Sequence, residues 1–128
     1  MIEVQAMRVL IAEYVLEQAS WRQAQAWEYP GDPRYRQCAA GLEELAAYFL
    51  GLPAADERLN ELARVCHDEL EVGVFAPRPG GRIHQLISRF RFYNATQSPT
   101  LIARRLVSAS IADKLEMGYV TGLLAEGG

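Results

Sequence analysis

Residues 32–53 read DPRYRQCAAGLEELAAYFLGLP, and this stretch decides the fold class. It opens with Asp32-Pro33, the pattern of an aspartate that caps a helix followed by proline in the first turn. It closes with Gly51 and Pro53, residues that end helices. In between, apolar residues recur at alternating spacings of three and four, as in helices that pack in bundles: Tyr35, Cys38, Leu42, Leu45 and Phe49. A helix from Pro33 to about Leu50 is therefore predicted.

The preceding residues predict another long helix, over residues 2–27. This range contains no glycine or proline and is rich in Ala, Glu, Gln and Leu, which favour helix formation. Its main apolar side is expected to face the core and consists of Val4, Met7, Leu10, Ile11, Tyr14, Val15 and Trp21. The opposite side carries Val9, Leu16 and Trp27. We therefore expect this helix either to pack on two sides or to offer a surface to a partner.

Three further helices are predicted after residue 53. Asp56 can cap the first, whose apolar face contains Leu59, Leu62, Ala63, Cys66, Leu70 and Val74. The second runs from about Arg82 to Tyr93, after the Pro/Gly-rich loop of residues 76–81. The third starts at Ser98-Pro99 and reaches about Met117, and the tail of residues 118–128 either continues this helix or folds back. The predicted fold is all-α, a single-domain bundle of about five helices, mostly antiparallel, formed by residues 1–128.

Apolar residues surround the axis of the helix that starts at Pro99. Leu101, Ile111 and Leu115 lie on one side, and Ile102 and Leu106 lie on the other. A central helix or an interface helix has this pattern. We predict a partner interface that consists of Val9, Leu16, Trp27, Ile102 and Leu106.

The charged residues are unevenly distributed. The formal net charge is -3, yet residues 72–112 contain no carboxylate and include Arg78, Arg82, Arg89, Arg91, Arg104 and Arg105. Pairing of these arginines with the acidic residues of the first part of the chain is the simpler interpretation. Arg104 in particular is expected to pair with Glu43, Glu44, Glu69 or Glu71, or alternatively with another subunit. The alternative is an anion or nucleic-acid site, in which the arginines hold phosphates and Phe92 stacks on a base.

The sequence offers little for catalysis or metal binding. His67 and Glu71 are four residues apart and would share a helix edge, which makes them weak candidates for metal ligands. Cys38 and Cys66 fall on apolar helix faces, as buried thiols do. Nucleotide-binding, hydrolase and zinc motifs are absent from the sequence. We therefore predict a protein without enzymatic activity or cofactor.

These patterns predict a non-enzymatic interaction or regulatory protein that acts through a homo-oligomer or a larger complex. The first alternative is a helical nucleic-acid-binding module that uses residues 72–112. The second is a bundle that binds a small ligand in its core, with Tyr14, Trp21, Tyr35 and Phe49 as lining. Charged residues interrupt the apolar runs and the N-terminal region, so we expect a cytoplasmic protein with no membrane partner.

Overall fold

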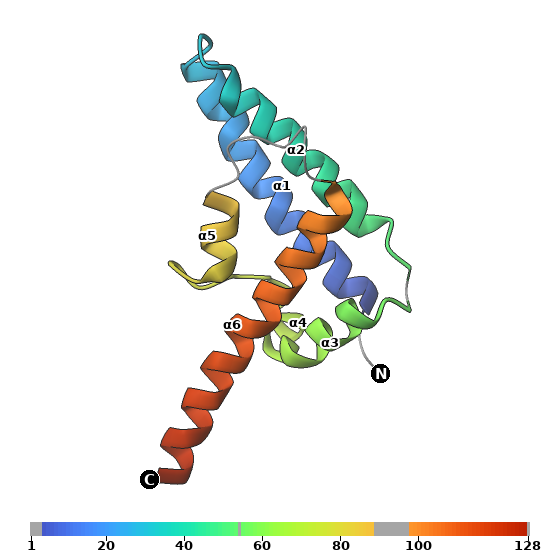
Figure 1. Ribbon diagram of the computed structural model, residues 1–128, viewed down its shortest axis with the longest axis vertical. Coiled ribbons are helices and arrows are strands. Elements are labelled where there is room, and N and C mark those ends of the chain that lie inside the picture. The colour runs from blue at the N-terminus through green and yellow to red at the C-terminus, as the bar shows by residue number, and fades with distance from the viewer. Residues whose placement is uncertain (1–3, 54, 89–97, 128) are drawn as a thin grey trace.

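The computed structural model describes residues 4–53, 55–88 and 98–127, with side chains up to residue 116, and these residues form helices without strands (Figure 1). This confirms the predicted all-α class. The helices are α1 (Val4–Glu28), α2 (Pro33–Leu50), α3 (Glu57–Val65), α4 (His67–Val72), α5 (Arg82–Ser88) and α6 (Pro99–Gly127).

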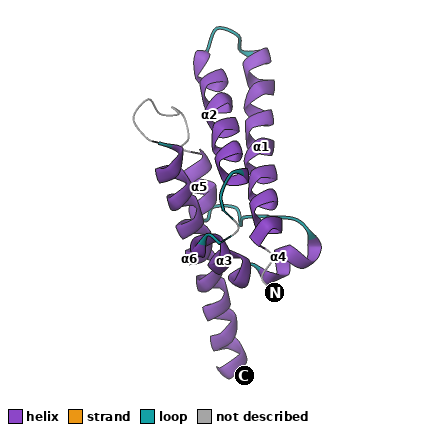
Figure 2. Cartoon of the chain, turned by 90° about the vertical axis from the view of Figure 1, so that its right-hand side faces the viewer, coloured by secondary structure: helices purple, strands orange, loops and turns teal. Residues whose placement is uncertain are grey.

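The long helices α1 and α2 form an antiparallel hairpin (Figures 1 and 2). Asp32 caps α2 as predicted, because its side chain accepts a hydrogen bond of 3.0 Å from the backbone N–H of Arg34. Inward-facing residues of the two helices are fully buried, among them Met7, Ile11 and Val15 on α1 and Leu42, Leu45 and Phe49 on α2. From Cys38 to Phe49 the predicted seam of α2 therefore lies in the core, whereas Tyr35, its first residue, is half-buried.

The single helix predicted after Asp56 is interrupted. The backbone of Cys66 leaves the helical conformation (φ −102°, ψ 37°), so that α3 ends and the short helix α4 begins. Gly73 then ends α4 with φ 74°, a left-handed conformation that favours glycine. As a result Val74 is 56% exposed, and the prediction that it lies on the core face is wrong.

The last helix is continuous from Pro99 to Gly127, so the tail extends the helix and does not fold back. Ser98 caps it as predicted, since its hydroxyl accepts a hydrogen bond from the backbone N–H of Leu101 at 3.3 Å. The first part of α6 packs on α2, α3 and α5, whereas its C-terminal part projects away from the other helices (Figures 1 and 2). Among the described residues, no helix combines the length and the apolar character that crossing a bilayer requires.

Candidate functional site

The outer side of α1 exposes large apolar side chains. Val9 is 44% exposed, Leu16 40% and Trp27 86%. Glu13, also exposed, lies between Val9 and Leu16 on the same side of the helix. We refer to Val9, Glu13, Leu16 and Trp27 as the α1 stripe. Three of these four residues belong to the partner interface predicted from the sequence.

The other two predicted interface residues lie in the core. Ile102 is 3% exposed and Leu106 is fully buried, because this side of α6 faces α2 and α3. A partner could reach them only by opening the fold, so their assignment to an interface is wrong. The opposite side of α6 faces outward and carries Leu101, Arg104 and Ser108, all exposed. We refer to these three residues as the α6 surface.

The α1 stripe has acidic surroundings. Glu17 and Glu28 are exposed on the same helix, and within the described residues neither they nor Glu13 form an ion pair. The two arginines of α1 point elsewhere: Arg8 donates to the backbone carbonyl oxygen of Leu52, and Arg22 is buried. Arg36 of α2 lines a hollow next to Trp27, so the field is negative over the part of the α1 stripe around Glu13.

The α6 surface has the opposite charge. Arg104 is exposed and has no ion pair among the described side chains. Three of its four predicted partners are engaged elsewhere, since Glu69 pairs with Lys114, Glu71 lies 3.5 Å from His67 and Glu43 accepts a hydrogen bond from Gln23. The fourth, Glu44, forms no ion pair among the described residues. The expected intramolecular pair of Arg104 is thus not formed.

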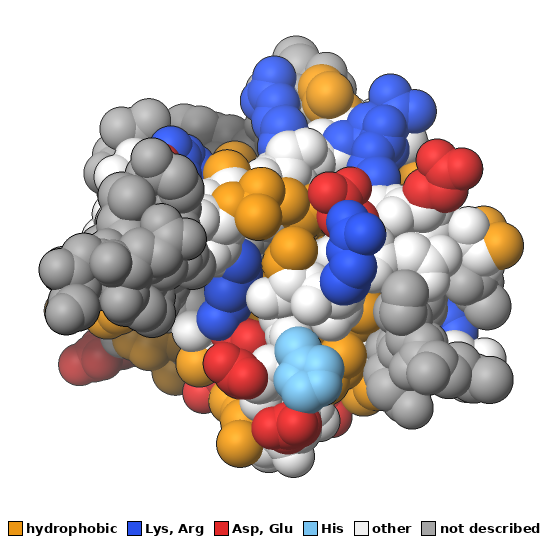
Figure 3. Space-filling model, turned by 90° about the horizontal axis from the view of Figure 1, so that it is seen from below, with side chains coloured by type: hydrophobic (Ala, Val, Ile, Leu, Met, Phe, Trp, Pro, Cys, Tyr) orange, Lys and Arg blue, Asp and Glu red, His pale blue; other side chains and the backbone are white. Residues whose placement is uncertain are grey.

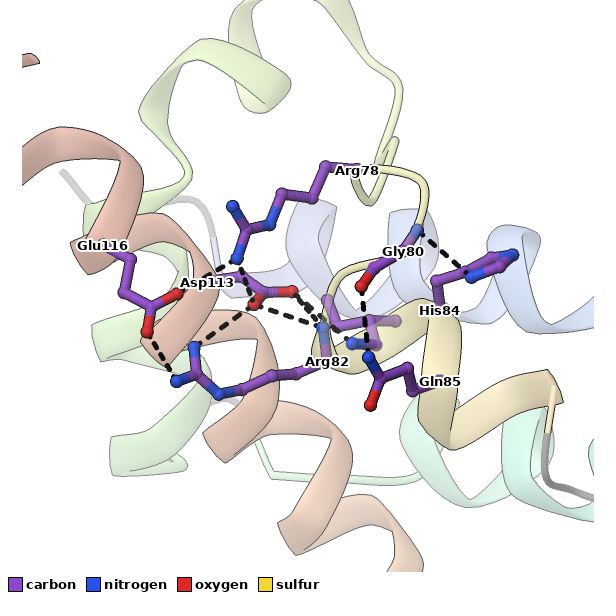
Figure 4. Close-up of polar contacts among 8 residues, drawn as sticks. Arg78, Gly80, Arg82, His84, Gln85, Asp113 and Glu116 are labelled. Carbon is purple, nitrogen blue, oxygen red and sulfur yellow. Dashed lines mark hydrogen bonds and ion pairs between the residues drawn. The ribbon is translucent and has the colours of Figure 1, made fainter. Parts of the chain in front are cut away.

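Two arginines of the acid-free segment meet acidic residues of α6 (Figure 4). Nη2 of Arg78 lies 3.0 Å from Oε2 of Glu116, and Nη2 of Arg82 lies 2.5 Å from Oε1 of the same residue. Both guanidinium groups also approach Asp113, at 3.4 and 3.5 Å. These acidic residues follow the acid-free segment, so for Arg78 and Arg82 the expected pairing with the first part of the chain is wrong.

Asp113 also organises the start of α5. It is 4% exposed, and its Oδ2 accepts hydrogen bonds from the backbone N–H groups of Arg82 (3.0 Å) and Ile83 (3.4 Å). The hydrogen bond and charge of Arg82 hold the pKa of Glu116 below its usual value, and Glu116 raises that of Arg82. This cluster ties α5 to α6 and has a structural role.

The nucleic-acid alternative stays a prediction, because the structure does not describe several of the residues that it requires. Arg89, Arg91 and Phe92 lie outside the described residues, and Arg105 is exposed on α6. On the face shown in Figure 3, arginine and lysine side chains alternate with acidic and apolar ones and form no continuous basic patch. Neutralisation of Arg78 and Arg82 further reduces the positive field expected from the segment.

The candidate metal ligands lie at a solvated edge of α4. Nδ1 of His67 is 3.5 Å from Oε1 of Glu71 and 3.9 Å from Oδ1 of Asp68. All three side chains are exposed. A histidine between two exposed carboxylates is common on helix surfaces and identifies no metal centre.

The cysteines and the predicted ligand-lining aromatics have different environments. Both cysteines are buried, and burial raises the pKa of the Cys66 thiol to about 11, which opposes a role as nucleophile. Phe49 belongs to the core, and Tyr14 packs edge-on against Phe75 with ring centroids 5.6 Å apart. Tyr14 also lines a surface hollow, as do Trp21 and Tyr35. Trp21 is 55% exposed, so the prediction that it faces the core is wrong.

No protein-family model matches this chain, and no curated protein or solved structure matches it either. Its function is therefore argued from the geometry of the described residues.

Proposed function

We propose that this protein is a non-enzymatic interaction protein that self-associates, with the α1 stripe of one copy packed against the α6 surface of another. The observation that carries this proposal is the exposure of Val9, Leu16 and Trp27 on a helix whose outward charges are acidic, together with a basic and apolar surface on α6 of the same chain.

The apolar residues provide the driving force. Burying a large apolar side chain contributes roughly 1.5–3 kcal/mol. Trp27, at 86% exposure, has more surface left to bury than the other residues of the stripe. Tryptophan is enriched among the residues that dominate binding energy at interfaces. We therefore expect Trp27 to be the main anchor of the contact.

The charges select the partner. Two α1 stripes brought face to face would place Glu13 near the same acidic residues of the other copy, which is unfavourable. The α6 surface offers Leu101 for apolar contact and Arg104 for Glu13. The complementary arrangement is thus one in which α1 meets α6.

A charge swap tests this arrangement. Size-exclusion chromatography with light scattering gives the mass of the full chain over a range of protein concentrations at low salt. Arg104→Glu and Glu13→Arg should each weaken association about tenfold, and the double variant should restore it. Arg64→Glu reverses an arginine of similar kind on α3, outside both surfaces, and is the matched control.

The same measurements also show which results would contradict the proposed contact. A chain that is monomeric at all concentrations, or a double variant that associates no better than either single variant, contradicts the proposed contact. The ratio of absorbance at 260 and 280 nm is recorded in each run. A high ratio that salt removes would favour the nucleic-acid alternative instead.

A further inference from the structure

A surface groove lies between α1, the start of α2 and α5, and Arg22 forms its floor. The groove consists of two adjoining hollows of about 340 and 370 Å³ that share Trp21, Arg22 and Ser88. Arg22 lines both hollows although it is only 8% exposed, so it lies at their base. Hollows of this size accommodate a small organic molecule.

The guanidinium group of Arg22 is held in place by backbone oxygens. Nη1 donates to the carbonyl oxygen of Gln18 at 3.1 Å, and Nη2 donates to that of Ile87 at 3.0 Å. The group also lies 5.6 Å from the centre of the Trp21 ring system. These contacts fix its orientation and leave further N–H groups of the guanidinium for a ligand.

Among the described residues, no carboxylate lies within ion-pair distance of the Arg22 guanidinium group. Two carboxylates line the groove. Asp32 is engaged by Arg34 at 2.6 Å, and Glu17, in the second hollow, forms no ion pair with Arg22. Residues 89–97, which follow α5 directly, contain no aspartate or glutamate in their sequence. Burial lowers the pKa of Arg22, as expected for a desolvated cation. A buried charge without a counter-ion is unfavourable, and a bound anion would compensate it.

The walls of the groove are aromatic. The rings of Trp21 and Tyr35 meet edge-on, with centroids 6.4 Å apart, and Tyr35 is stacked on Tyr29 at 6.1 Å. Trp21 remains 55% exposed, so part of its surface is available for contact. Aromatic walls next to a fixed guanidinium suit a planar ligand that carries one negative charge.

We infer that this groove binds a small aromatic carboxylate, with the carboxylate on the guanidinium of Arg22 and the ring against Trp21 and Tyr35. Arg22 determines the charge that is bound, because the guanidinium fork matches a carboxylate in shape and charge. The aromatic walls determine the shape of the ligand that fits the groove. This inference does not depend on the proposed self-association, since neither Arg22 nor Tyr35 belongs to the contact surfaces.

Three probes test separately whether the groove recognises the negative charge and whether it recognises the aromatic ring. Isothermal titration calorimetry on the full chain compares 2-naphthoate, 2-naphthamide and decahydronaphthalene-2-carboxylate. The amide keeps the ring and removes the charge, whereas the third probe keeps the charge and removes the aromatic ring. We expect 2-naphthoate to bind and each of the others to bind about tenfold more weakly or worse. Failure of 2-naphthoate to bind, or equal binding of the amide, would overturn the inference.

Single substitutions test whether 2-naphthoate binds in this groove. Trp21→Ala should weaken 2-naphthoate binding about tenfold, whereas Trp27→Ala, the same change at the other tryptophan of the chain, should leave it unchanged. Arg22→Gln should abolish binding, and Arg22→Lys should restore only part of it because lysine lacks the planar fork. If Arg22→Gln does not fold, two comparisons still test the inference: Trp21→Ala with Trp27→Ala, and 2-naphthoate with 2-naphthamide. Equal losses in the two tryptophan variants would overturn the assignment of the groove.

Discussion

The carboxylate of Asp113, on α6, accepts a hydrogen bond of 3.0 Å from the backbone N–H of Arg82, the first residue of α5. An aspartate from a distant helix thus accepts the hydrogen bonds that a local capping residue accepts in other helices. A helix as short as α5 is unstable by itself, so this contact anchors both its position and its first turn.

Asp113→Ala should therefore destabilise the protein by about 2 kcal/mol, because it leaves buried N–H groups at the start of α5 without an acceptor. Urea denaturation followed by circular dichroism measures the loss. Glu116→Ala serves as the comparison, since Glu116 contacts the same arginines from an exposed position, and its effect should be much smaller. Equal losses in the two variants would mean that the backbone cap is unimportant.

Gly81→Ala should also be destabilising, by roughly 1–3 kcal/mol. A Cβ at residue 81 would lie 2.8 Å from Oδ2 of Asp113 and 2.8 Å from Cγ of Arg78. The carboxylate cannot retreat without releasing the N–H groups of α5. Thermal unfolding would be compared with that of Gly31→Ala, where a Cβ meets no atom within 4 Å. In the background of Asp113→Ala the effect of Gly81→Ala should shrink, because the carboxylate that it crowds has gone.

Acid should weaken the cap of α2. The side-chain hydrogen bond of Arg34 lowers the pKa of Asp32 to about 2, from 3.8. A pKa that is lower in the folded than in the unfolded state stabilises the fold above the unfolded value and ceases to do so as the pH falls through the folded value. Between about pH 4 and pH 2, the melting temperature of the wild type should therefore fall more than that of Asp32→Asn. Arg34→Gln removes the side-chain partner but keeps the backbone N–H, so it should lose most, but not all, of this acid-sensitive component. Parallel melting curves of wild type and Asp32→Asn would contradict this.

The pair formed by Glu69 and Lys114 joins α4 to α6 in a largely buried setting, with side chains 9% and 27% exposed. Removing one partner should cost about 3 kcal/mol, because the other charge then stays buried without compensation. Lys114→Met and Glu69→Met test this in urea unfolding. The double variant should be more stable than the sum of the single losses predicts. Strict additivity would show that the two charges do not interact in solution.

Much of the helical organisation follows from local sequence. The capping roles of Asp32 and Asp56 were predictable because each side chain binds a backbone N–H only two or three residues away. The core face of α2 was predictable for a similar reason, since a spacing of three and four places apolar residues on one side of any helix. The break at Cys66 had no comparable signal, because the apolar pattern continues through it.

The sequence by itself therefore determined the all-α class, the starts of α2 and α6, and the clustering of Val9, Leu16 and Trp27 on one side of α1. Only the tertiary structure decided which side of α6 faces the core, because apolar residues surround that helix and its pattern favours neither side. It also decided that Arg78 and Arg82 meet Asp113 and Glu116, and that Arg22 is buried without an ion pair to any described residue. These relationships join residues more than 30 positions apart. Helical periodicity describes a single helix, and such contacts depend on how separate helices pack.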